Sequence, residues 1–237
     1  MKKTLQILLL SVGLTGCSSL VLEPVSSSQD ETQRILSLGL THEENLIEAG
    51  KLKSTHSISV VTGQLNKARD EKNQAEVDLV ESVKFAEMVV VSDNSSNFIG
   101  SKISESINKG VLMTDVDFQD YYLSGVKGAN YGLLKHQLHL IIKHNSNDKR
   151  IYSSANVCDK WNRCDLDRRD VTLISSIASN CTSSSCDYTE VMELDLADQF
   201  LTDKMEDGFT MLFNSKKQKN KITISSAYIK GYLKIAK

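Results

Sequence analysis

Apolar residues recur at near-heptad spacing between residues 57 and 91. Eight of the ten positions on this stripe are apolar: Ile58, Val61, Leu65, Ala68, Lys72, Ala75, Leu79, Ser82, Ala86 and Val89. The spacing predicts one long helix over 57–91 with a buried stripe. Two interpretations remain open, a helical hairpin that packs within its own domain and a coiled coil that joins several copies. Three alanines on the stripe and Gly63, which costs about 1 kcal/mol in a helix, favour the hairpin.

Two shorter helices are predicted upstream, over 29–38 and 42–49. Ser28 with Glu31, and Thr41 with Glu44, have the spacing of a capping box. Gly39 and Gly50 stand where C′ glycines follow helices.

The hydrophobic period changes to two after Tyr131. Leu138, Leu140 and Ile142 alternate within 133–143, as a half-buried strand requires. The turn residues 145–148 (NSND) and the segment 149–157 then predict a return strand. Further patterns predict a short helix near 98–108, strands over 171–179 and 188–196, a short helix over 197–205, a hairpin of 208–214 with 221–225, and a closing helix over 226–236.

These elements predict an α+β fold. An N-terminal helical segment, as a hairpin or coiled coil, precedes an antiparallel β-sheet or β-sandwich with two local disulfides. The predicted divisions are a signal peptide (1–16), a lipidated cysteine with tether (17–28), a helical region (29–92), a connecting region (93–130) and a β-rich domain (131–237).

The first sixteen residues have the three parts of a secretory signal. Lys2 and Lys3 are followed by the apolar run 5–14 and by the small residues Thr15 and Gly16. A basic start, an apolar run of about 7–15 residues and a small-residue cleavage site define such a signal. The run is too short to span a bilayer, which takes about 20 apolar residues.

The residues Leu14-Thr15-Gly16-Cys17 resemble the lipobox of bacterial lipoproteins. The resemblance covers only the first twenty residues, and no family resemblance is apparent for the mature domain. It implies transfer of diacylglycerol to the Cys17 thiol, cleavage before Cys17, and palmitate or another fatty acyl chain on the new amine. In Gram-negative lipoproteins, Asp directly after the cysteine resembles a signal for retention in the inner membrane, and Ser18 stands there instead. For a Gram-negative host the resemblance then implies an outer-membrane lipoprotein that faces the periplasm. We therefore expect acylated Cys17 to bind the chain to a lipid bilayer.

Composition limits the partners. The formal net charge is −2 and becomes −4 once Lys2 and Lys3 are removed with the signal. No basic excess argues for nucleic acid. We expect an unknown envelope protein or glycan as the partner and no cofactor.

Four cysteines remain after Cys17: Cys158, Cys164, Cys181 and Cys186. An even number in an oxidising compartment predicts disulfides. Three pairings are possible, and the close spacings favour Cys158 with Cys164 and Cys181 with Cys186. The alternative, a zinc site, fits less well because five and four residues intervene, against the usual two to four.

The sequence offers one candidate contact loop. Trp161, the only tryptophan, lies with Arg163 between Cys158 and Cys164. Tryptophan and arginine on a rigid loop are typical of binding hot spots. The competing interpretation is an indole packed over the disulfide.

Three histidines lie in the predicted strand 133–143 or just after it. His136 and His139 would point to opposite faces of a strand and could not share a metal ion. We therefore predict no metal site and interpret His136, His139 and His144 as surface or rim residues.

Charged segments form two further candidates. Residues 187–207 carry eight acids against Lys204, and a pair such as Asp195 and Asp198 could serve glycoside hydrolysis. A solvated acidic face is the simpler interpretation. Lys216, Lys217, Lys219 and Lys221 lie at a predicted hairpin tip, where lysines either contact anionic groups or protect a sheet edge.

No local catalytic motif is present, neither a G-x-S-x-G elbow nor H-E-x-x-H. Convergent triads need no such motif. The leading expectation is a non-enzymatic binding or assembly module in the periplasm. The alternatives are a peptidoglycan- or polysaccharide-active hydrolase that uses the acidic segment, and a structural module that oligomerises through 57–91.

Overall fold

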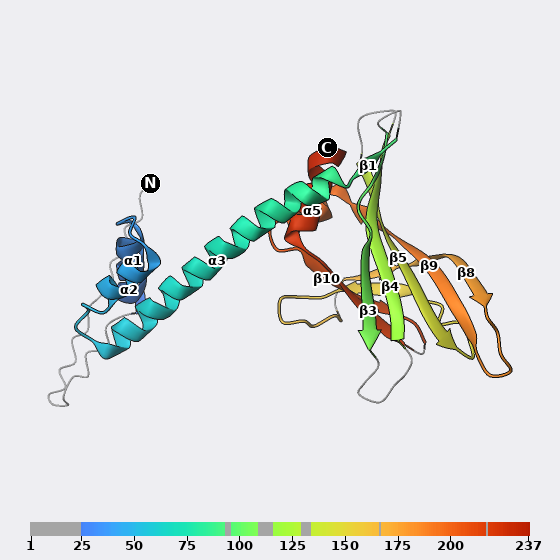
Figure 1. Ribbon diagram of the computed structural model, residues 1–237, viewed down its shortest axis with the longest axis horizontal. Helices are drawn as coiled ribbons and strands as arrows, with labels where there is room; N and C mark the ends of the chain where they lie inside the picture. The colour runs from blue at the N-terminus through green and yellow to red at the C-terminus, as the bar shows by residue number, and fades with distance from the viewer. Residues whose placement is uncertain (1–24, 93–95, 109–115, 129–133, 166, 217) are drawn as a thin grey trace, which may run out of the picture. The chain divides into compact units, whose positions relative to one another are not determined.

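The computed structural model describes residues 25–92, 96–108, 116–128, 134–165, 167–216 and 218–237 (Figure 1). Contacts divide the chain into two units, residues 1–72 and 73–237. Helix α3 (Thr55–Glu87) begins in the first unit and ends in the second.

The first unit contains α1 (Val25–Leu36), α2 (His42–Ala49) and the first half of α3. The predicted capping box of α2 is confirmed: the Thr41 side chain accepts from the Glu44 backbone, and the Glu44 side chain accepts from the Thr41 backbone. The three helices share a small core of Ile35, Ala49, Val61 and Leu65. This core fixes the N-terminal half of α3 against α1 and α2.

Helix α1 begins earlier than the sequence predicted. The tether was expected to run through residue 28, with Ser28 as the N-cap, but α1 starts at Val25. In the sequence Pro24 directly precedes Val25, and proline is tolerated at a helix start. Gly39 has the left-handed φ of +67° expected of a C′ glycine, whereas Gly50 stays right-handed.

The buried stripe predicted along α3 is wrong in its middle. Val61 and Leu65 are buried in the first unit and Ala86 is buried in the second. Between them Leu79 is 66 % exposed, and the helix gives way after Glu87 to the two-residue strand β1 (Val90–Val91). The near-heptad spacing therefore predicted the helix correctly but joined two separate packing faces into one.

The second unit is built from two antiparallel sheets. The larger sheet has the order β1-β2-β4-β5-β9-β8, with β3 also paired to β4, and the smaller has the order β11-β10-β6-β7. The remaining bounds are β2 Asn97–Ile99, β3 Ile103–Asn108, β4 Val116–Lys127, β5 Leu134–Ser146, β6 Ser154–Val157, β7 Arg168–Asp170, β8 Thr172–Ser179, β9 Cys186–Ala197, α4 Asp198–Asp203, β10 Phe209–Asn214, β11 Lys219–Ile224 and α5 Ser226–Ala236. The predicted α+β class with antiparallel sheets is confirmed.

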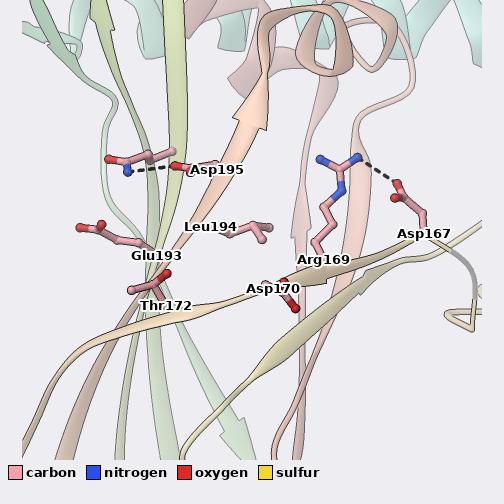
Figure 2. A pocket seen from close by; sticks show the side chains of 8 residues that line it. Asp167, Arg169, Asp170, Thr172, Glu193, Leu194 and Asp195 are labelled. Carbon is pink, nitrogen blue, oxygen red and sulfur yellow. Dashed lines mark hydrogen bonds and ion pairs between the residues drawn. The ribbon is translucent and has the colours of Figure 1, made fainter.

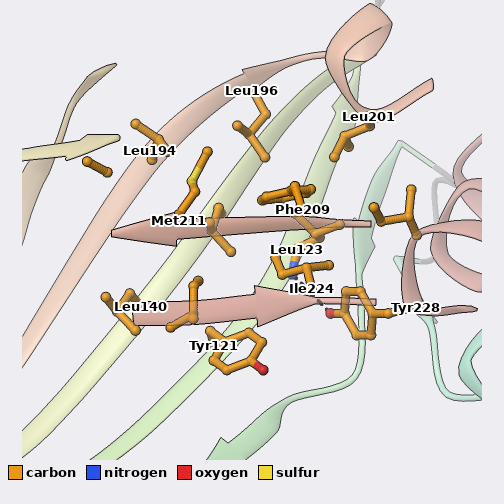
Figure 3. Packing of buried hydrophobic residues seen from close by; sticks show 14 of the residues in the cluster. Tyr121, Leu123, Leu140, Leu194, Leu196, Leu201, Phe209, Met211, Ile224 and Tyr228 are labelled. Atoms are coloured by element: carbon orange, nitrogen blue, oxygen red, sulfur yellow. Dashed lines mark hydrogen bonds between the residues drawn. The ribbon is translucent and has the colours of Figure 1, made fainter. Parts of the chain in front are cut away.

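One apolar core lies between the two sheets (Figure 3). Alternate residues of β5 point into it, among them Leu138, Leu140 and Ile142, all fully buried. From the smaller sheet, Met211 and Ile224 pack against them. The alternation detected in the sequence is therefore the inner face of the central strand.

Helix α5 closes one side of this core. Tyr228, Tyr232 and Leu233 are buried in it. At Gly231 a Cβ atom would lie 2.5 Å from the Ser82 carbonyl oxygen and 2.9 Å from the Ala86 backbone nitrogen. Glycine is needed there because α5 and the end of α3 approach too closely for a side chain.

A buried polar layer holds the chain where it passes from the larger sheet to the smaller. The Arg150 guanidinium donates to both carboxylate oxygens of Asp117, at 2.6 and 3.0 Å. The Glu190 carboxylate accepts from the backbone N–H groups of Arg150 and Ile151, at 3.1 and 3.3 Å. Ile151 has a φ of +51°, which is a strained value for a β-branched residue.

This layer explains why the predicted hairpin of 133–143 with 149–157 is wrong. Arg150 turns inward to Asp117, and the chain continues into the other sheet instead of folding back. Strand β6 consequently pairs with β10 and β7, while β5 pairs with β4 and β9.

The helix predicted near 98–108 is also wrong, since this segment forms β2 and β3. Within β3, Glu105 accepts from Tyr121 Oη at 2.6 Å and from Gln119 Nε2 at 2.7 Å. Glu105 therefore occupies an inward-pointing position of β3, where an apolar residue would have produced the two-residue hydrophobic period that predicts a strand.

We predict that Arg150→Ala lowers the free energy of unfolding of the second unit by about 3–5 kcal/mol, because it leaves a buried carboxylate without its cation. The measurement is urea denaturation followed by the near-ultraviolet circular dichroism of the buried tyrosines. Glu206→Gln is the control. It removes the 2.8 Å ion pair between Glu206 and Lys230, in which the Glu206 side chain is 73 % exposed, and it should lower the free energy of unfolding by at most about 1 kcal/mol. Equal effects of the two changes would contradict the prediction.

Candidate functional site

The lipobox residues Leu14-Thr15-Gly16-Cys17 lie outside the described residues, so the anchor stays a prediction. Of the helices that the structure describes, none is both long enough and apolar enough to cross a membrane.

Both predicted disulfides are present at bonding distance. The sulfur atoms of Cys158 and Cys164 are 1.95 Å apart, and those of Cys181 and Cys186 are 2.09 Å apart. The first bridge closes residues 158–164, named here the Trp161 loop.

Asp159 organises the Trp161 loop from within. Its carboxylate accepts from the backbone N–H groups of Trp161 and Arg163, both at 2.9 Å, and from Arg163 Nε at 2.7 Å. These bonds hold the pKa of Asp159 below its ordinary value, chiefly through the Arg163 backbone. Asn162 takes the left-handed φ of +64° that the tight turn requires. The loop is thus fixed by its own covalent and polar bonds.

The indole of Trp161 is 67 % exposed. Lys160 Nζ lies 4.5 Å from its ring centroid and Arg163 Cζ lies 5.0 Å from it. This exposure favours the contact-site interpretation over an indole packed on the disulfide.

The lysine-rich strand β11 lies beside the Trp161 loop, a proximity that the sequence did not reveal. Lys221 Nζ donates to Asn162 Oδ1 at 2.7 Å. Lys219 and Lys221 alternate with buried residues and face solvent. Lys216 is also exposed, and Lys217 lies outside the described residues. Lys160, Arg163, Lys219 and Lys221 are named the basic surface.

An acidic pocket of about 630 Å³ lies where β7, β8 and β9 approach one another (Figure 2). Four carboxylates line it, with one guanidinium that pairs with Asp167 at 2.9 Å. The lining residues are Gln137, Asp167, Arg169, Asp170, Thr172, Glu193, Leu194 and Asp195.

The acidic segment 187–207 does not form one surface. Glu190 is fully buried, whereas Glu193 and Asp195 line the acidic pocket. Asp198 lies instead against His136, with its Oδ1 3.2 Å from Nε2. The two carboxylates suggested for glycoside hydrolysis, Asp195 and Asp198, therefore have different surroundings, and only Asp195 lines the pocket.

The histidines of β5 point to opposite faces as predicted, but the expectation that they lie on the surface is wrong. His136, His139 and His144 are 1 %, 9 % and 4 % exposed. His136 Nδ1 lies 2.9 Å from Tyr232 Oη, and His144 Nε2 lies 3.7 Å from Glu190 Oε2. Residues distant in sequence cover these rings, and the local pattern carries no signal of that cover.

His139 lies between a hydroxyl and a carboxylate on the outer face of the larger sheet. Its Nε2 is 2.7 Å from Ser124 Oγ, and its Nδ1 is 3.3 Å from Glu193 Oε1. The Tyr122 ring stacks on the imidazole at 4.5 Å with an interplanar angle of 7°. Ser124 was not a candidate in the sequence, because the three residues come from β4, β5 and β9.

Burial lowers the pKa of both His136 and His139. Asp198 beside His136 and Glu193 beside His139 oppose this effect without overcoming it. Both imidazoles are therefore neutral over most of the physiological range, and a neutral imidazole can accept a proton.

Within the described part of the chain, no group of three or more His, Cys, Asp or Glu side chains is placed to hold a metal ion. Comparisons with protein-family models, with curated proteins and with solved structures found no match for this chain.

We predict that His136 and His139 titrate below their ordinary pKa of 6.5, as followed by nuclear magnetic resonance of the ring protons. A depressed pKa means that the folded state binds fewer protons, so these groups make the fold lose stability as the pH falls below 6.5. His139→Gln should weaken that loss between pH 6.5 and the folded pKa. Titration of both rings at or above 6.5 would contradict the prediction.

Proposed function

We propose that the chain is an envelope lipoprotein, anchored by acylated Cys17, that acts as a binding or assembly module. The anchor rests on the lipobox resemblance. The exposed Trp161 on its closed loop supports the binding role, because a rigid aromatic side chain contributes contact area with little loss of conformational entropy. The partner is another envelope component, a protein or a glycan, and binding at this surface requires no catalytic step.

The basic surface adds a preference to this proposal. Lys160 and Arg163 lie over the indole, and Lys221 contacts the same loop. Cations beside an exposed aromatic ring favour partners with acidic groups at the point of contact.

The helical region has two candidate arrangements in this proposal. We interpret α2 and the first half of α3 as a helical hairpin, since Ala49, Val61 and Leu65 share one core. A coiled coil between copies is the second candidate. It is favoured by Val77, Leu79 and Val80, which are 49 %, 66 % and 56 % exposed. Sedimentation equilibrium distinguishes the two, because a monomeric 18–237 fragment excludes the coiled coil.

For the anchor, we predict that Cys17→Ala abolishes incorporation of labelled palmitate and releases the protein from the membrane fraction. Two or more acyl chains on one residue bind stably, whereas an unacylated chain has no such anchor. Cys181→Ser together with Cys186→Ser serves as the control for loss of cysteine. Palmitate on the Cys17→Ala protein would refute the assignment.

For the contact site, we predict that Trp161→Ala reduces capture of the envelope partner at least tenfold, as expected when a hot-spot residue costing more than about 1.4 kcal/mol is removed. The measurement is cross-linking in native membranes followed by quantitative mass spectrometry of the captured species. Ile177→Ala removes another exposed apolar side chain, 61 % exposed on β8, and should leave capture unchanged. Equal capture by the wild-type and Trp161→Ala proteins would argue against this surface.

A further inference from the structure

Three polar side chains meet on the outer face of the larger sheet in the order hydroxyl, imidazole, carboxylate. His139 pairs in register with Tyr122 on β4 and with Glu193 on β9, and Ser124 lies two residues along β4 from Tyr122. Because residues two apart on a strand share a face, Ser124, His139 and Glu193 all point outward. They are named the Ser124 triad.

The distances assign a role to each nitrogen of His139. With Glu193 Oε1 3.3 Å from Nδ1, the Nδ1–H tautomer is favoured. Nε2 then has a free lone pair for the Ser124 hydroxyl at 2.7 Å. This is the arrangement in which a carboxylate orients a base and the base activates a nucleophile. The stacked Tyr122 ring keeps the imidazole in that plane.

The protonation state agrees with the geometry. Burial lowers the pKa of His139, and the adjacent Glu193 only partly opposes this. The imidazole is consequently available as a proton acceptor near neutral pH.

Exposed aliphatic side chains lie next to the hydroxyl. Ile99 is the register partner of Ser124, and Val90 is the register partner of Ile99. Val126 follows two residues along β4 on the same face. These three side chains are 63 % (Val90), 46 % (Ile99) and 48 % (Val126) exposed. An exposed apolar group of this kind beside a polar centre is typical of a ligand surface.

We propose that Ser124 is the nucleophile, and His139 the general base, of a hydrolytic site for esters with an aliphatic acyl group. The acyl chain lies on Val90, Ile99 and Val126. Gln137, directly opposite Ser124 in register, donates one amide N–H to Asp195 Oδ1 at 3.0 Å and has its second N–H for the developing oxyanion. Glu193 is a positioning residue. This site is separate from the Trp161 loop and does not depend on the proposed binding function.

The reaction proceeds in two steps, acylation of Ser124 and then hydrolysis of the acyl-serine. Ser124 Oγ forms a bond to the ester carbonyl carbon and its proton passes to His139 Nε2. The carbon–oxygen bond to the alcohol breaks, and the alcohol leaves with that proton. Water then attacks the acyl-serine, gives a proton through His139 back to Ser124 Oγ, and releases the carboxylic acid.

The test uses the full chain in detergent with two probes, an alkyl fluorophosphonate and p-nitrophenyl butyrate. The phosphonate should form a Ser124 Oγ–phosphorus bond with loss of fluoride, mapped by peptide mass spectrometry. Ser124→Ala should abolish labelling. His139→Gln should slow ester hydrolysis by about 10²–10⁴-fold, the usual contribution of a general base.

Three further variants separate catalysis from structure. Glu193→Gln should slow ester hydrolysis in the wild-type background and have no further effect on hydrolysis in the Ser124→Ala background. Glu193→Asp, which keeps the carboxylate, should hydrolyse the ester faster than Glu193→Gln does. Ser146→Ala is the matched control, because Ser146 Oγ also lies near a histidine, 3.1 Å from His144 Nδ1, and its loss should change neither readout.

Circular dichroism of each variant establishes that it is folded. The proposal is overturned if folded wild-type protein leaves Ser124 unlabelled, if His139→Gln is labelled as fast as wild type, or if Ser124→Ala hydrolyses the ester at the wild-type rate.

Discussion

The second unit depends on the buried ion pair between Asp117 and Arg150. Both side chains are almost wholly inaccessible, at 3 % and 4 % exposure, and removing two charges from water costs several kcal/mol each unless the geometry compensates. The bidentate contact supplies that geometry.

Glu190 adds the second constraint by accepting two backbone N–H groups of the same turn. Burial raises the pKa of Glu190, but His144 and these N–H groups outweigh it, so the pKa lies below the ordinary value and the carboxylate stays charged. Together they direct the chain from β5 into the smaller sheet and make one core between two sheets possible.

The same constraint limits what the sequence could predict. Strand β5 and helix α5 could be predicted because apolar residues mark their periods, in β5 at the three successive inward positions Leu138, Leu140 and Ile142. Strands β3 and β4 were missed because inward positions carry Glu105, Asp117 and Gln119, which look like loop or helix residues until their partners are known. The predicted return strand after β5 failed for a related reason, since only tertiary structure shows that Arg150 turns inward. The hydrophobic pattern therefore fails to predict secondary structure where inward-pointing polar residues form hydrogen bonds or ion pairs with residues distant in the sequence.

The candidate sites differ in the same way, because local features could be predicted from the sequence and contacts between distant residues could not. The Trp161 loop was predictable because a close cysteine pair and an aromatic residue between them are local features. The link from Lys221 to Asn162 spans 59 residues, and no local pattern contains it. The Ser124 triad is still less accessible to sequence analysis, because three strands contribute one residue each. Serine, histidine and glutamate at such separations are unremarkable until the register brings them together.

The strand register determines both which residues form the core and which residues meet on the outer face of the sheet. On β5, His136, Leu138, Leu140 and Ile142 point inward, so His139 must point outward. A slip of one residue would place Lys135 and Lys143 in the apolar core, a cost far greater than any gain at the surface. The inner face therefore fixes which residues meet on the outer face, without any requirement that those outer contacts be stabilising. Because the positions of Ser124, His139 and Glu193 are set by burial on the other side of the sheet, the sheet holds the triad in a defined geometry whether or not a substrate is bound.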